Sequence, residues 1–153
     1  MEDVSVRRLD ESMLDGAAEL ERLCFSSPWS REALKLLCSD GAVGFAAVDT
    51  NGKVVAYGGM MCVLDEGQIT NIATHPDFRR RGFGLSIVNA LLDYGRDNGI
   101  NLFSLEVRES NSAAIALYEG LGFVGVGLRK NFYSSPTENA VVMIKEINSN
   151  SKE

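Results

Sequence analysis

A glutamate within an otherwise apolar segment is the first residue whose type and position suggest chemistry. Glu106 lies in the sequence Ser-Leu-Glu-Val-Arg, residues 104–108, and its apolar neighbours alternate with it. Burying a carboxylate costs free energy, so such a residue either faces solvent or serves a purpose such as proton transfer. The residues alone leave both interpretations of Glu106 open, a solvated strand face and a general base.

Tyr118 is the second candidate for proton transfer. It lies near the end of a short amphipathic segment, where an aromatic side chain commonly belongs to the core. Its phenol has an ordinary pKa of about 10, close to that of an alkyl thiol, so it could also protonate a departing thiolate. Asn111 stands at the expected start of the same helix and is typical of an N-cap. Core packing and capping are the alternatives to functional roles for these two residues.

A glycine-containing basic turn is the third feature that suggests chemistry. Residues 79–84 read Arg-Arg-Arg-Gly-Phe-Gly and lie between a strand-like and a helix-like segment. The first N–H groups of a helix are unpaired, and glycine lets a phosphate approach the backbone closely. A pyrophosphate would use successive N–H groups from Arg80 to Leu85. The alternative is a plain turn with solvated arginines. A G-x-G-x-x-G motif would need glycine at Ile87, and G-x-x-x-x-G-K-[ST] does not occur.

The remaining nucleophiles and metal ligands give no comparable signal. His75 is the only histidine and precedes a proline, so a Ser-His-Asp or Cys-His site is not indicated. Cys24, Cys38 and Cys62 are odd in number and form no C-x-x-C pair, so neither a disulfide framework nor a zinc knuckle is indicated. We expect reduced cysteines packed as small core residues, and no metal site.

The segments that must position these residues alternate between strand and helix periodicity. The pattern predicts strands over residues 4–9, 43–48, 54–63, 68–74, 102–107, 123–128 and 140–147. It predicts helices over residues 14–23, 30–39, 85–98 and 113–119, with Ser30 as an N-cap and Gly99 as a C-terminal cap. The order β-α-α-β-β-β-α-β-α-β-β predicts an α+β, or mixed α/β, fold with helices packed on a largely antiparallel sheet.

Composition restricts the class of protein. A chain of 153 residues with 45% apolar and 24% charged side chains is typical of one globular domain. The net charge of −6 argues against direct nucleic-acid binding and suits a cationic partner. Neither a signal peptide nor an apolar run of membrane-spanning length is present, so we expect a cytoplasmic protein without a membrane partner. Residues 148–153 are polar and are expected to form a frayed tail.

Two motifs together resemble the acetyl-CoA-binding core of the GNAT superfamily of N-acetyltransferases. The first is the basic glycine turn that follows a strand. The second is Asn111-x-x-Ala114-x-x-Leu117-Tyr118-x-x-Leu121-Gly122-Phe123. Within this superfamily, residues 25–30, 71–73, 105–108 and 129–133 look like the RimI-type ribosomal-protein-alanine acetyltransferases. The resemblance covers roughly residues 4–147 and implies a single GNAT domain over residues 1–147.

The resemblance implies acetyl-CoA as co-substrate and gives roles to particular residues. The general base falls on Glu106 and the general acid on Tyr118. The cofactor contacts fall on Ile72, Ala73, Thr74, Arg80, Arg81, Gly82, Phe83, Gly84, Leu85 and Asn111. In this scheme the carboxylate takes a proton from the incoming ammonium, directly or through water, and the phenol protonates the departing thiolate. Backbone N–H groups beside the thioester would stabilise the oxyanion.

The implied acceptor is the N-terminal α-amine, expected to be that of alanine, of a basic ribosomal protein. An α-amine with a pKa near 8 is roughly 10% neutral at pH 7, whereas a lysine amine is neutral about once in 2,500 molecules. A protein lysine or a small amine as acceptor remains an alternative, as does a noncatalytic acyl-CoA-binding module. Phe132 and Asn139 depart from the RimI-type pattern, which usually has a tyrosine and an acidic residue there, and they bear on acceptor choice.

Overall fold

Seven strands form one sheet in the computed structural model, which describes residues 3–147. The strands are β1 (Val4–Arg8), β2 (Ala42–Asp49), β3 (Val54–Val63), β4 (Glu66–Thr74), β5 (Leu102–Arg108), β6 (Val124–Tyr133) and β7 (Glu138–Glu146). The helices are α1 (Leu14–Cys24), α2 (Arg31–Lys35), α3 (Phe83–Asp97) and α4 (Ser112–Gly120). The expected tail, residues 148–153, lies outside the described residues.

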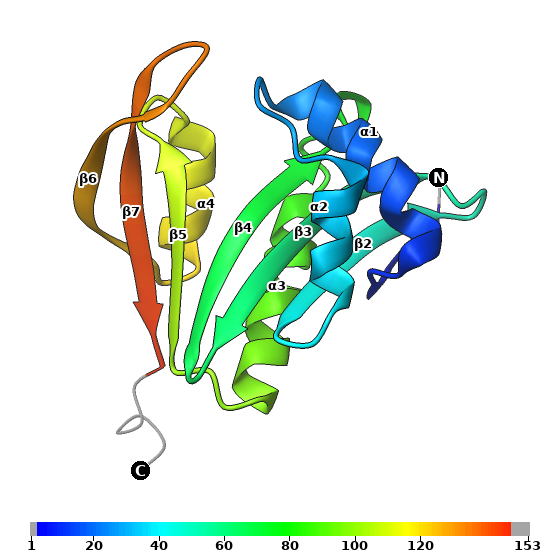
Figure 1. The fold of residues 1–153 in the computed structure, drawn as a ribbon, viewed down its shortest axis with the longest axis horizontal. Helices are drawn as coiled ribbons and strands as arrows, with labels where there is room; N and C mark the ends of the chain where they lie inside the picture. Colours follow the sequence, from blue (N-terminus) through cyan, green and yellow to red (C-terminus); the bar gives the residue numbers. More distant parts are fainter. Residues whose placement is uncertain (1–2, 148–153) are drawn as a thin grey trace.

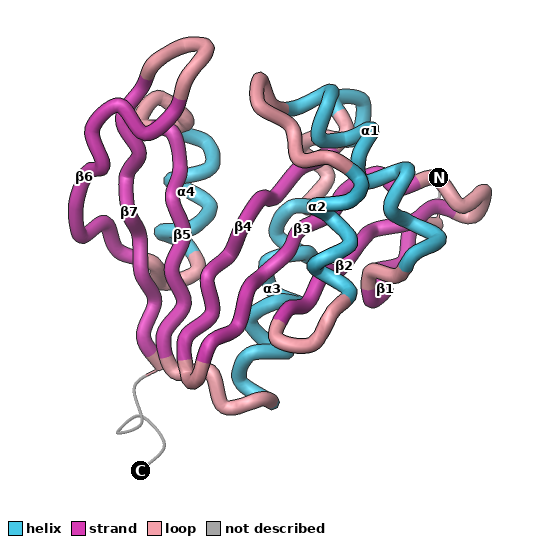
Figure 2. The backbone as a smooth tube through the Cα atoms, viewed as in Figure 1, coloured by secondary structure: helices cyan, strands magenta, loops and turns pink. Residues whose placement is uncertain are grey.

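The strand order across the sheet is β1-β2-β3-β4-β5-β7-β6, as Figure 1 shows for β2 to β7 and Figure 2 for β1. All neighbouring pairs are antiparallel except β4 and β5. β4 and β5 run parallel because the chain passes through α3 between them. This crossover returns the chain to the end of the sheet at which β4 began, as parallel pairing requires. The predicted α+β fold with a largely antiparallel sheet is therefore confirmed.

The two central strands separate along their length. β4 and β5 pair only where they begin, from Glu66–Leu102 to Gln68–Ser104. Beyond that point they diverge, and the two halves of the sheet open toward one end of the molecule (Figure 1). Residues 72–74 of β4 remain paired with β3 on one side, while the side that faces β5 has no strand partner among the described residues.

Alternating side chains build a core on each face of β2 and β3. Val43, Ala47 and Ala56 pack with α3, whereas Ala46 and Tyr57 pack with α1 and α2. Successive side chains of a strand point to opposite faces, so these strands are apolar at nearly every position. In Figure 2, α1 and α2 cover one face and α3 the other. Within residues 3–147, no helix is both long and apolar enough to cross a membrane.

The largest differences from the predicted boundaries occur in two places. The predicted helix 30–39 divides into α2 and a 3-10 turn, Leu36–Cys38, and Cys38 is exposed rather than packed in the core. The strand predicted over residues 123–128 continues as β6 to Tyr133. Charged and polar residues interrupt its apolar pattern, but β6 is an edge strand whose side chains are nearly all exposed, so hydrogen bonding to β7 sets its length.

Candidate active site

The predicted phosphate turn forms the start of α3. Gly82 is its N-cap and has a φ of +82°, a conformation that favours glycine. The Ser86 N–H donates to the Gly82 carbonyl at 3.0 Å. The preceding N–H groups, those of Phe83, Gly84 and Leu85, have no acceptor among residues 3–147. Such unpaired donors at the positive end of a helix dipole favour an anion.

Gly84 leaves open space beside the helix start. A Cβ built there would meet nothing closer than Thr74 Oγ1, at 3.7 Å. Thr74 ends β4, so the unpaired β4 edge leads to the start of α3. The structure thus brings the predicted strand contacts, Ile72, Ala73 and Thr74, next to the predicted phosphate turn.

The three adjacent arginines are not equivalent. The Nε of Arg79 donates to the Thr74 carbonyl at 3.3 Å. The guanidinium of Arg81 lies over the Phe78 ring, 5.0 Å from its centroid. Arg80 has a φ of +66°. In the part of the chain that is described, its side chain makes neither a hydrogen bond nor an ion pair. Arg80 is therefore the arginine of this turn whose charge is best available to a ligand.

Glu106 lies on β5, across the divergence from the β4 edge. Its side chain is 17% exposed and forms an ion pair with Arg129 of β6. Arg129 is itself 55% exposed and lies over the Phe132 ring, with 4.6 Å between the guanidinium carbon and the ring centroid. Glu106 is therefore neither a freely solvated surface residue nor an isolated buried charge.

Tyr118 packs in the core and keeps its hydroxyl accessible. Its ring meets Phe123 edge to face, with 5.8 Å between centroids. Burial raises the pKa of Tyr118 to about 12, with a smaller contribution from Tyr133. Its hydroxyl has no hydrogen-bond partner within residues 3–147, yet it is not among the fully enclosed unpaired polar atoms, so the oxygen reaches solvent. The phenol is thus protonated at neutral pH and reachable from outside the core.

Tyr133 joins these two candidates at the end of β6. Burial raises the pKa of Tyr133, and the charge of Glu106 raises it further. Tyr133 also contributes to the raised pKa of Tyr118, so its phenol is electrostatically coupled to that phenol and to the Glu106 carboxylate. Neither the type nor the spacing of Tyr133 and Arg129 in the sequence predicts a functional role for them. The only signal for them is their place in the 129–133 segment.

Arg108 connects the segments around this end of the molecule. Its guanidinium donates to the carbonyls of Ser134 and Pro136, each at 3.1 Å, and pairs with Glu138 at 3.1 Å. It also reaches the Ser26 hydroxyl at 3.4 Å, and that hydroxyl donates to the Ser134 carbonyl at 3.3 Å. The connection between α1 and α2 is thereby held against the connection between β6 and β7.

Asn111 performs its predicted capping role. Its Oδ1 accepts the N–H of Ala114 at 3.2 Å, which satisfies a donor at the start of α4. Ser30 likewise accepts the Ala33 N–H at 3.1 Å and caps α2.

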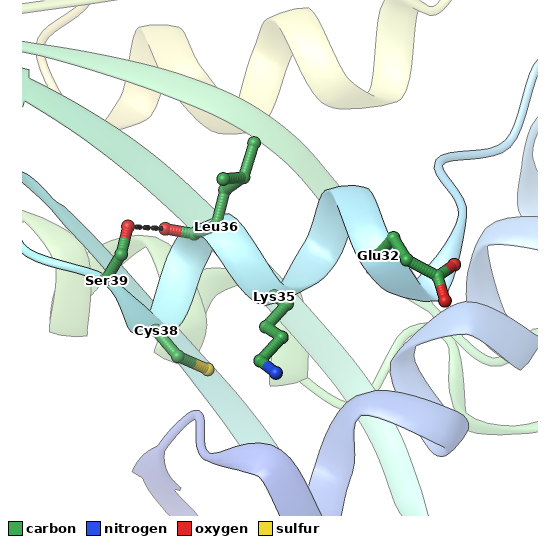
Figure 3. A pocket seen from close by; sticks show the side chains of 5 residues that line it. All are labelled: Glu32, Lys35, Leu36, Cys38 and Ser39. Carbon is green, nitrogen blue, oxygen red and sulfur yellow. Dashed lines mark hydrogen bonds between the residues drawn. The ribbon is translucent and has the colours of Figure 1, made fainter.

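A separate hollow lies beside α2 and contains none of the candidate residues. Figure 3 shows its lining, which consists of Glu32, Lys35, Leu36, Cys38 and Ser39. The Ser39 hydroxyl donates to the Leu36 carbonyl at 2.6 Å there. Among the described residues, no three His, Cys, Asp or Glu side chains gather as they would around a metal ion.

Comparison with known families decides the class of this site. Residues 14–123 match the sequence profile of the Acetyltransferase (GNAT) family. The chain belongs to the GNAT acetyltransferase family. It is therefore an acetyltransferase, and the resemblance seen in the two sequence motifs is confirmed.

Sequence alignments with two relatives cover most of this chain. A [ribosomal protein bS18]-alanine N-acetyltransferase of Escherichia coli K12 is 35% identical over 141 residues, which cover 91% of this chain and 95% of that protein. The protein with the same description from Haemophilus influenzae is 37% identical over 128 residues, 82% of this chain and 86% of that one. These matches confirm the RimI-like character of this GNAT chain.

Solved structures agree with the fold. The crystal structure of the ribosomal-protein-S18-alanine N-acetyltransferase from E. coli has a TM-score of 0.87 at 34% identity and covers 95% of each chain. Arabidopsis thaliana NAA60, crystallised with acetyl-CoA, has a TM-score of 0.86 at 18% identity and covers 96% of this chain and 100% of that one. At 18% identity the likeness concerns the fold alone.

Proposed function

We propose that this enzyme transfers the acetyl group of acetyl-CoA to the N-terminal α-amine of alanine in ribosomal protein bS18, and that residues 1–147 form its one acetyltransferase domain. The divergence of β4 and β5 carries the proposal. On the β4 side of this divergence lie the free edge of β4 and the start of α3, which can bind an anion. On the β5 side lie Glu106 and Tyr118. The acceptor is inferred from relatives about 35% identical over most of the chain.

The residues on the β4 side suit the shape and charge of acetyl-CoA. The N–H groups of residues 82–85, with Arg80 and Arg81, would hold the pyrophosphate, and the open space at Gly84 lets it approach. The free edge of residues 72–74 would pair with the amides of the pantetheine arm, as an added strand would. Asn111 would contribute from the start of α4. Acetyl-CoA supplies the thioester whose acyl group is transferred.

Glu106 and Tyr118 would divide the proton transfers. Glu106 accepts a proton from the acceptor ammonium, directly or through one water, which leaves the amine nucleophilic. Before this transfer, the acceptor ammonium would bind beside the Glu106 carboxylate, which also pairs with Arg129. Tyr118 donates its proton to the departing sulfur, and its raised pKa keeps that proton in place at neutral pH.

A panel of acceptors tests the proposal. We expect acetylation at the first nitrogen of an Ala-starting basic peptide, measured by mass-spectrometric mapping of the modified atom. Peptides with a blocked N-terminus and an internal lysine, and small amines, should react far more slowly. Preference for lysine or a small amine would move the acceptor to another class. Binding of acetyl-CoA with no turnover on any acceptor would indicate a noncatalytic binding module.

A further inference from the structure

Glu21 carries a carboxylate that no step of the proposed chemistry uses. It lies on α1, and its exposure is 0%. Within residues 3–147 it forms no ion pair. Burying an uncompensated charge is costly, and removing the groups that satisfy it is costly as well. The burial of the Glu21 carboxylate without an ion-pair partner therefore needs a structural explanation.

Three uncharged donors from three segments satisfy this carboxylate. The Tyr57 hydroxyl of β3 donates to Oε2. The Asn71 amide of β4 lies 3.2 Å from Oε1 and 2.9 Å from Oε2. The backbone N–H of Trp29, just before α2, donates to Oε1 at 2.8 Å. Burial and the nearby Glu21 charge raise the pKa of Tyr57, which keeps its hydroxyl a donor. One carboxylate therefore ties α1 to the sheet and to the α1–α2 connection.

Asn71 lies at an irregularity of β4. Residues 70 and 71 stand opposite Gly59 alone, because the pairing of β4 with β3 skips a position there. A β-bulge of this kind bends a strand and redirects its side chains. Residues 72–74, the free edge proposed for acetyl-CoA, follow directly. The Asn71 contact thus fixes the point from which that edge begins.

Through Trp29, the contacts of Glu21 also extend toward the β6–β7 connection, where the acceptor is expected to bind. Trp29 belongs to the connection of residues 25–30 between α1 and α2. Ser26, in the same connection, contacts the Ser134 carbonyl at 3.3 Å and the Arg108 guanidinium at 3.4 Å. Glu21 therefore sets the distance between this connection and β4.

We propose that Glu21 is a positioning residue for acetyl transfer. Through Asn71 it holds the bulge of β4 in place. Through the Trp29 N–H it holds the connection of residues 25–30, beside which the acceptor amine would bind. The inference rests on the proposed function, since it requires acetyl-CoA along β4 and the amine near Glu106. Misplacement of reacting groups by about 1 Å can cost about 100-fold in rate.

The E21Q variant tests this, with E19Q as the matched control. Glutamine keeps the side-chain volume but cannot accept from Asn71, Tyr57 and the Trp29 N–H together. Glu19 lies exposed on the same helix and pairs with Arg22. We expect kcat for the Ala-starting peptide to fall about 10- to 100-fold in E21Q, with full stoichiometry and a much smaller change in the affinity for acetyl-CoA. E19Q should match the wild type. Calorimetry and steady-state kinetics are run at a temperature where both variants are folded.

The N71A variant supplies the second arm and also serves if E21Q does not fold. It leaves Glu21 with the Tyr57 and Trp29 donors and cuts its link to β4. We expect N71A to lower kcat in the same way, and the double variant E21Q/N71A to be less impaired than the product of the single effects. Such coupling is expected when one residue acts through the other.

Two results would overturn the positioning role. One is a kcat per bound acetyl-CoA in the variants equal to that of E19Q, even if their melting temperature falls. The other is full additivity of E21Q and N71A. Wild-type activity is measured first, because a wild type inactive on every acceptor would contradict the proposed function rather than the role of Glu21.

Discussion

At the scale of single residues, Glu106 combines partial burial with an ion pair to Arg129. Its side chain is far enough from bulk water to act on a bound amine, and Arg129 balances its charge when no acceptor is present. Its position in an apolar strand was visible in the sequence, but Arg129 was not foreseen. The two residues lie 23 positions apart and meet only because β7 pairs with both β5 and β6.

Replacing Glu106 by glutamine removes the proton acceptor and keeps the shape. We expect E106Q to lower kcat at least about 100-fold, the usual contribution of a positioned general base, with little change in acetyl-CoA affinity. Steady-state kinetics and calorimetry measure the two quantities. E119Q, an exposed glutamate on α4, is the control. Turnover in E106Q equal to that in E119Q would remove Glu106 from the mechanism.

The raised pKa of Tyr118 predicts a pH effect on stability with a definite sign. Burial raises this pKa to about 12 in the folded protein, and the unfolded chain has the ordinary value of about 10. The stabilisation from the protonated phenol is therefore complete below about pH 10 and is lost as the pH rises toward about 12. Urea unfolding should show that the wild type loses more stability than Y118F between about pH 9 and about pH 11. Parallel losses in the two proteins would contradict the raised pKa.

At the scale of elements, the site depends on where β4 and β5 stop pairing and on the start of α3. Local signals predicted that helices follow these turns, because Ser30 and Asn111 cap the helices that start beside them and Gly82 lies in the glycine turn before α3. The end of pairing at Gln68 and Ser104 has no local signal, since it depends on two strands joined through a helix. The buried carboxylate of Glu21 was missed for the same reason.

Gly84 tests the proposed role of the helix start. We expect G84V to weaken acetyl-CoA binding at least about 10-fold, because a side chain there would block approach to the backbone. Its melting temperature should change little, since a Cβ at this position meets only Thr74 Oγ1 at 3.7 Å. G120V is the control, because Gly120 also faces open space. Calorimetric titration gives the comparison, and equal affinities in the two variants would contradict the phosphate-turn assignment.

At the scale of the whole molecule, the net charge of −6 favours a basic acceptor segment. We expect KM for a basic Ala-starting peptide to rise several-fold between about 0.05 M and about 0.3 M salt, because added ions screen this attraction. A neutral peptide with the same first residues is the control and should change little. Identical salt dependence for both peptides would show that overall charge does not guide the acceptor.

The most direct test of the central claim uses intact bS18. The protein is prepared with its N-terminal alanine either free or chemically blocked, and each form is incubated with the enzyme and acetyl-CoA. We expect one acetyl group on the free form, mapped by mass spectrometry to the alanine nitrogen, and none on the blocked form. Acetylation of lysines in both forms, or no acetylation of the free form by an enzyme that binds acetyl-CoA, would contradict the proposed function.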